Sequence, residues 1–92
     1  MFANIAELQD ANAARGGFWF TNMDHNGSTI ASDLVDGRYF VVDDHLDITN
    51  PSAGRCYRIA AATPEAVIAY VPVDGSARYD SLDQALAAIA AL

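Results

Sequence analysis

The sequence predicts an α+β domain in which an antiparallel sheet of four to five strands packs against an N-terminal and a C-terminal helix. Three observations lead to this prediction. A helix-capping pattern stands near each end of the chain, and β-branched and aromatic runs fill its middle. Asn-Gly and Asp-Gly pairs separate those runs, as hairpin turns do. We expect residues 1–92 to form one domain, with both helices covering the same face of the sheet.

The first expected helix begins after Asn4 and extends to Arg15. Asn4 is a favoured N-cap residue, and Glu7 three positions later can bond back to the cap. Gly16 and Gly17 then supply a left-handed helix stop. The apolar stripe of this helix is weak, so we expect a narrow contact with the sheet.

The strands are expected in the centre of the chain. The Asn26-Gly27 pair predicts a hairpin between the first two of them, and the Asp36-Gly37 pair predicts a second tight turn. A long polar connection is expected at 43–54, between the third and fourth strands. The fourth segment alternates its side chains with a period of two. The expected strands are 18–21, 28–31, 38–42, 55–61 and 66–73.

The second helix follows Ser81, which forms a capping box with Gln84. Apolar residues then recur at helical spacing, so that they share one face. This pattern predicts a helix that packs on the sheet and belongs to the core. The residues of the apolar face are Leu82, Ala85, Leu86, Ile89 and Leu92.

The charges of the chain limit its partners. There are five arginines and no lysine, against twelve acids of which ten are Asp, and the formal net charge is −7. A chain this acidic is expected to repel nucleic acid and membrane surfaces and to favour a basic partner. No apolar run is long enough to span a membrane, and no signal peptide is apparent, so we expect a cytoplasmic protein in the host cell.

No residue pattern predicts an enzyme or a cofactor. His25 and His45 each follow an aspartate, but no further ligand is spaced to complete a metal site with them. Cys56 has arginines nearby that could lower the pKa of its thiol, yet its place within a strand favours a buried structural role. We therefore expect no catalytic residue, no metal and no cofactor.

The candidate binding residues are mostly aspartates in expected loops. Asp43, Asp44 and Asp47 fall within five residues, and long loops in small domains often carry function. A calcium loop would need a central Gly and a terminal Glu that this stretch lacks. Trp19 points to the face opposite its aromatic neighbours, either packed under a loop or part of a binding surface. The remaining candidates are Asp24, Asp33 and Asp36.

Several short runs are similar to those of a group of short accessory proteins encoded by phages and plasmids. The runs are 11–20, 27–30, 37–42, 55–59 and 79–85, which together extend over nearly the whole chain. They mark turns and strands rather than chemistry. The resemblance therefore implies a mobile-element context and no catalytic residue. The chain departs from the pattern in its long 43–54 loop.

In general character the chain also resembles anti-CRISPR and anti-restriction proteins, which are short, acidic and act by binding a host defence complex. The leading hypothesis is a non-enzymatic inhibitor whose acidic surface docks on the basic nucleic-acid-binding site of a host protein or ribonucleoprotein, without contacting nucleic acid itself. The alternatives are a small structural or assembly module acting as a homodimer through a sheet edge or the face around Trp19, and, ranked last, a small enzyme or metal-binding protein.

Overall fold

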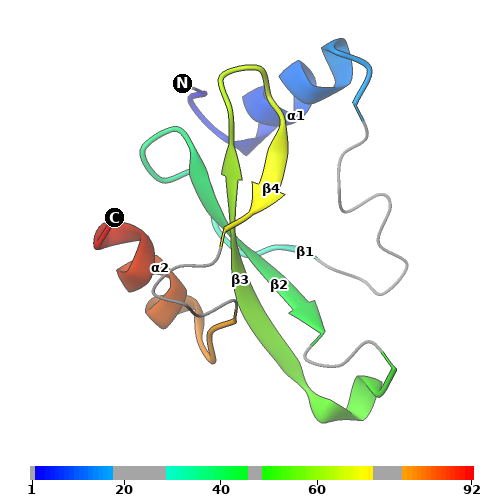
Figure 1. Cartoon of the computed structure of the whole chain (residues 1–92), viewed down its shortest axis with the longest axis vertical. Helices are drawn as coiled ribbons and strands as arrows, with labels where there is room; N and C mark the ends of the chain where they lie inside the picture. Colours follow the sequence, from blue (N-terminus) through cyan, green and yellow to red (C-terminus); the bar gives the residue numbers. More distant parts are fainter. Residues whose placement is uncertain (1, 18–28, 46–48, 72–77) are drawn as a thin grey trace.

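The computed structural model describes residues 2–17, 29–45, 49–71 and 78–92, and the statements below concern these residues. The chain has the predicted α+β arrangement, with one helix near each end and four strands between them (Figure 1). A single 3-10 turn, η2, follows the second strand. The elements are α1 (Ile5–Ala14), β1 (Thr29–Ile30), β2 (Tyr39–His45), η2 (Pro51–Ala53), β3 (Arg55–Ala62), β4 (Ile68–Tyr70) and α2 (Leu82–Ala90).

The four strands form one antiparallel sheet in the order β1-β2-β3-β4. Its centre is the long β2–β3 pair, in which Val41 lies opposite Ile59. The predicted turn before β2 is confirmed, because Asp36 and Gly37 both have positive φ, at 55° and 67°. Tight hairpin turns need such values, which Asp tolerates better than most residues. Each strand of the sheet therefore lies beside its neighbour in sequence, an order that the sequence alone left open.

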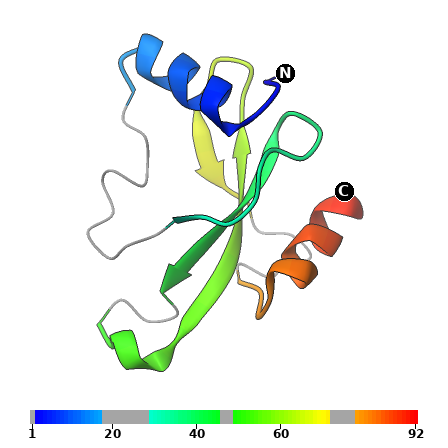
Figure 2. The same cartoon turned by 180° about the vertical axis from the view of Figure 1, so that it is seen from behind.

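The two helices cover opposite faces of the sheet, so the prediction that both lie on one face is wrong. Leu8 of α1 packs with Phe40 and Val42 of β2, whereas Ile89 of α2 packs with Val41. Successive residues of a strand point to opposite faces. With the sheet seen near its edge, α2 lies on one side of the strands and α1 on the other (Figures 1 and 2). The domain is therefore a three-layer arrangement with two half-cores that share the strands.

Each half-core is small. The α1 half-core consists of Leu8 and the residues beneath it on β2, β3 and the following turn, and the α2 half-core joins the buried face of α2 to Val41 and Ile59. Asn12 adds a polar contact, because its buried amide Nδ2 donates to the carbonyl of Ala66 at 3.0 Å. This bond ties α1 to the β3–β4 turn.

Both predicted N-caps are confirmed, but the back-bond of each capping box goes to the residue before the cap: Glu7 Oε2 accepts the N–H of Ala3 and Gln84 Oε1 accepts the N–H of Asp80, each at 3.2 Å. The side chain of Asn4 accepts from the N–H of Glu7 at 2.9 Å, and the hydroxyl of Ser81 accepts from the N–H of Gln84 at 3.1 Å. Gly16 ends the first helix with a φ of +81°, as its left-handed stop requires. On α2, Ala85 and Ile89 are buried, but Leu92 is 61% exposed and does not join them.

Two strand boundaries differ from the prediction. β2 continues through Asp43 and Asp44 to His45, so these residues belong to a strand and not to the polar connection expected at 43–54. β4 covers only Ile68–Tyr70 of the longer strand expected at 66–73. The expected strand at 18–21 lies outside the described residues; of the strand expected at 28–31, residue 28 also lies outside them and β1 covers Thr29–Ile30.

Candidate partner-binding surface

Asp33 is held against the start of α1. Its Oδ1 accepts the N–H of Ile5 at 2.8 Å and the N–H of its neighbour Leu34 at 2.7 Å. The first N–H groups of a helix have no partner within the helix, and a carboxylate there is also favoured by the helix dipole. Asp33 remains exposed while it makes these bonds. The sequence placed it in a binding surface, and the structure adds a role as a helix cap.

Asp36 is exposed and lies on a turn that is bonded to the N-terminal segment. The N–H of Phe2 donates to the carbonyl of Gly37 at 3.3 Å, which fixes the turn beside α1. Glu7 lies in the first turn of α1, and its carboxylate accepts the N–H of Ala3, which precedes the helix, at 3.2 Å. Each of the three exposed acids Glu7, Asp33 and Asp36 thus lies on the segment that begins α1 or on a stretch of chain bonded to it, and we call these three residues the acidic rim.

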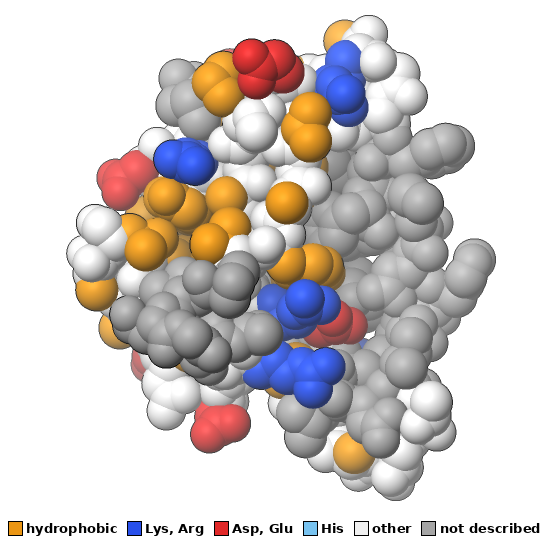
Figure 3. Space-filling view, in the orientation of Figure 1, with side chains coloured by type: hydrophobic (Ala, Val, Ile, Leu, Met, Phe, Trp, Pro, Cys, Tyr) orange, Lys and Arg blue, Asp and Glu red, His pale blue; other side chains and the backbone are white. Residues whose placement is uncertain are grey.

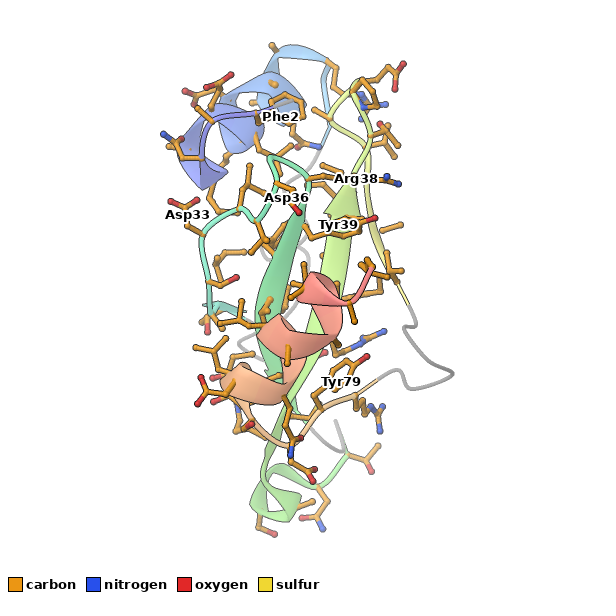
Figure 4. The ribbon with its side chains drawn as sticks, turned by 90° about the vertical axis from the view of Figure 1, so that its left-hand side faces the viewer. Phe2, Asp33, Asp36, Arg38, Tyr39 and Tyr79 are labelled. Atoms are coloured by element: carbon orange, nitrogen blue, oxygen red, sulfur yellow. The ribbon has the colours of Figure 1, made fainter. Side chains whose placement is uncertain are left out.

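A cation and aromatic rings lie beside the acidic rim. Figure 4 shows Asp33 at the left-hand border of the view and Asp36 nearer its middle, with Phe2 above Asp36 and with Arg38 and Tyr39 to its right. The guanidinium carbon of Arg38 stands 5.1 Å from the centre of the Tyr39 ring, within the range of a cation–π contact. Tyrosine and arginine are over-represented among interface hot spots. The rim is therefore charged and bordered by groups suited to protein contacts.

Asp43 forms an ion pair on the α2 face of the sheet. Its Oδ1 lies 2.8 Å from Nε of Arg55, and its backbone carbonyl accepts from the same guanidinium at 3.4 Å. Arg55 lies on β3, two residues before Tyr57, which is the residue opposite Asp43. The pairing places two opposite charges side by side on the sheet, so Asp43 contributes little net negative charge to a docking surface.

Asp44 forms the corresponding pair on the opposite face. Its Oδ2 lies 3.4 Å from Nη1 of Arg58, and the guanidinium carbon of Arg58 stacks 3.5 Å from the ring centre of Tyr70. The Nε of Arg58 is buried and has no hydrogen-bond partner among the described residues. The surface at this edge of the sheet shows arginine side chains gathered side by side with an acidic side chain beside them (Figure 3). Asp44 is therefore also neutralised locally.

Cys56 lies on the same face as Arg58 and is 2% exposed, as predicted for a structural cysteine. Burial raises the pKa of its thiol. Arg78 and Arg58 act in the opposite direction but do not outweigh the burial. The thiolate is the reactive form of cysteine, so this thiol is poorly suited to nucleophilic chemistry at neutral pH.

The structure thus divides the predicted binding residues into three groups. Asp33 and the turn that holds Asp36 are both bonded to the segment that begins α1, while Asp43 and Asp44 pair with arginines on opposite faces of the sheet. Asp24, Asp47 and Trp19 lie outside the described residues. Sequence reasoning missed the roles of Arg55, Arg58 and Tyr70, although the period-two pattern of 55–61 already puts Cys56 and Arg58 on one face.

Among the described residues, no group of three or more His, Cys, Asp or Glu side chains is placed to hold a metal ion. Within the same ranges, neither helix has the length and apolar character that crossing a membrane requires. Comparison with protein-family models, with curated proteins and with solved structures finds no match to this chain. The function must therefore be argued from the geometry of its surface.

Proposed function

We propose that the protein is a non-enzymatic inhibitor of the anti-CRISPR or anti-restriction type, encoded by a mobile element, which binds a basic surface of a host nucleic-acid-handling complex. The observation that carries the proposal is the acidic rim of Glu7, Asp33 and Asp36. All three carboxylates are exposed; those of Glu7 and Asp33 accept backbone N–H groups, and the turn that carries Asp36 is bonded to Phe2 through the carbonyl of Gly37. The net charge of −7 supports attraction to a basic partner over a long range.

The rim suits docking because its geometry exists before binding. Asp33 and the turn at Asp36 are each bonded to the segment that begins α1. A surface that is ordered in advance loses less conformational entropy when a partner binds. Carboxylates arranged in this way can occupy a groove that otherwise holds phosphates, since both are oxyanions that arginine and lysine recognise.

The test removes the charges of the rim without removing its fold. The variant Glu7→Gln/Asp33→Asn/Asp36→Asn keeps the side-chain oxygens that accept the capping bonds, and Asn tolerates the positive φ at position 36. We expect a slower on-rate for a candidate defence complex, a flatter dependence of that rate on salt, and fewer plaques on a host carrying the defence system.

The matched control is Glu65→Gln, which removes one exposed acid from the β3–β4 turn, compared with Asp36→Asn as the equivalent single change. Both single variants lower the net negative charge by one. Glu65→Gln should therefore slow association only by the small amount that this change in net charge causes, and by less than Asp36→Asn does. If the triple variant inhibits the defence system as well as the wild-type protein does, the acidic rim is not the docking surface.

Self-association is a second candidate, favoured by one observation. The β3–β4 hairpin forms one edge of the sheet and exposes two large apolar side chains, Val67 at 41% and Tyr70 at 36%. Sheet edges readily pair with other strands unless charge or proline protects them. Sedimentation equilibrium of the wild-type protein and of Val67→Glu tests this alternative. A wild-type protein that sediments as a monomer at all concentrations contradicts it.

A further inference from the structure

Asn12 of α1 is 4% exposed and is the only polar residue that the described part of the chain buries. Its Nδ2 donates to the carbonyl of Ala66 at 3.0 Å, 54 positions away in the chain. Its Oδ1 is buried without a hydrogen-bond partner among the same residues. Burying an amide that is only half bonded costs free energy, which offsets much of what the bond contributes. The side chain is therefore a weak source of stability, and its specific effect is to fix the position of one carbonyl.

The residue that Asn12 holds has a strained backbone. Ala66 has a φ of +64°, which glycine adopts freely and alanine only at a cost. It closes the β3–β4 turn, because its N–H donates to the carbonyl of Thr63 and the N–H of Thr63 donates to the carbonyl of Val67, each at 2.9 Å. Ala66 is also 1% exposed and belongs to the α1 half-core with Leu8. The contacts that offset the strain at this turn therefore come from α1.

The helix side of the contact is constrained as well. The N–H of Gly17 donates to the carbonyl of Asn12 at 3.0 Å, and a Cβ at Gly17 would lie only 2.9 Å from Nδ2 of Asn12. The chain that leaves α1 thus passes close against the amide and restricts its rotation. Both views of the ribbon show the β3–β4 turn beside α1 (Figures 1 and 2).

We propose that Asn12 and Ala66 form a conformational latch that makes the edge strand β4 depend on α1. β4 has three residues and lies at one end of the strand order. While α1 is docked, the latch holds the turn and keeps β4 on β3. When the contact is broken, Ala66 relaxes from its positive φ and β4 separates, which uncovers an edge of β3 that can pair with other chains. The latch is independent of what the acidic rim binds.

Hydrogen exchange of single amides, measured by NMR under native conditions, tests the latch. The reporters are Thr63 and Val71, whose N–H groups donate across the β3–β4 pair at 2.9 Å. The references are Ala31 and Ala62, whose N–H groups donate to carbonyls of β2 and of the residue before it. In Asn12→Leu, which keeps the volume but removes the donor, protection of both reporters should fall by about tenfold or more. Both references should keep their protection.

Two further variants separate the latch from general effects on α1. Gln9→Leu makes the same change of an amide to leucine at an exposed position of the helix and should leave all four amides unchanged. Adding Ala66→Gly to Asn12→Leu should restore the protection of the reporters, because glycine keeps a positive φ without help from the bond. If leucine prevents folding, Asn12→Ala removes the same donor without adding bulk and takes its place in both comparisons.

Four results would overturn the proposal. The first is wild-type protection of both reporters in Asn12→Leu. The second is an equal loss at reporters and references, which would show that Asn12 supports the whole domain and not β4 in particular. The third is the same loss of reporter protection in Gln9→Leu. The fourth is a double variant whose reporters stay unprotected, because the strain at Ala66 would then have no part in the effect.

Discussion

Replacing Ile89 with alanine measures how firmly α2 belongs to the fold. Ile89 is 2% exposed and packs with Val41 and Ile59 across the sheet. The substitution removes the Cγ1, Cγ2 and Cδ1 atoms, each worth about 0.8 kcal/mol of transfer free energy. The strands beneath cannot follow the shortened side chain, because α1 packs on their other face, so a cavity adds to this loss. We expect the free energy of unfolding to fall by about 3 kcal/mol, within the range usual for such changes.

The assay is urea-induced and thermal unfolding followed by circular dichroism. For a domain of this size, about 1 kcal/mol corresponds to about 4–8 °C in Tm, so Ile89→Ala should melt about 12–24 °C below the wild-type protein. Leu92→Ala is the control, because Leu92 is 61% exposed and its truncation should change the free energy of unfolding by less than about 0.5 kcal/mol. Equal midpoints for the two variants would refute the reasoning and show that α2 is peripheral.

Three further changes test local features. Asp33→Ala removes the acceptor of the Ile5 and Leu34 N–H groups and should reduce the free energy of unfolding by about 1 kcal/mol in the same urea assay, whereas Asp33→Asn should lose less. Gly16→Ala places a Cβ at a φ of +81° and should cost about 1–2 kcal/mol; no change would mean that α1 ends in another way. Because burial raises the pKa of Cys56, its neutral form stabilises the fold below the ordinary thiol pKa of about 8.5, and this contribution is lost as the pH rises through the raised value. Stability should therefore fall at alkaline pH in the wild-type protein and less in Cys56→Ala, and a thiol reagent should label the native protein slowly and the unfolded protein quickly.

Local features of the fold could be predicted from the sequence because local chemistry determines them. Asn4, Ser81 and Gly16 act on residues within a few positions, and the structure confirms all three. The face of the sheet that each helix covers is not local information, since an apolar helical stripe shows only that one side is buried. A signal for two covered faces was present in the consecutive apolar residues Phe40 and Val41, because half-exposed strands alternate instead.

The candidate site was predicted less completely for the same reason. Two adjacent aspartates usually indicate a loop, but Asp43 and Asp44 extend β2 because Arg55 and Arg58 on the neighbouring strand pair with them. Likewise, the role of Asp33 as a cap depends on a helix 28 positions earlier in the chain. Contacts between residues so distant in sequence follow from the packed arrangement and not from residue spacing.

β2 contributes residues to both half-cores, and this arrangement determines how the domain unfolds. Phe40 and Val42 are anchored beneath α1, and Val41 between them is anchored beneath α2. If either helix detaches, one face of β2 becomes exposed to solvent, and the strand on which the other helix packs is destabilised. Neither helix layer is therefore expected to remain folded without the other. The amides of β2 and β3 should therefore exchange with solvent only when the whole domain unfolds, and at one common free energy. A chain with two separate apolar clusters would then behave in unfolding as a single cooperative unit.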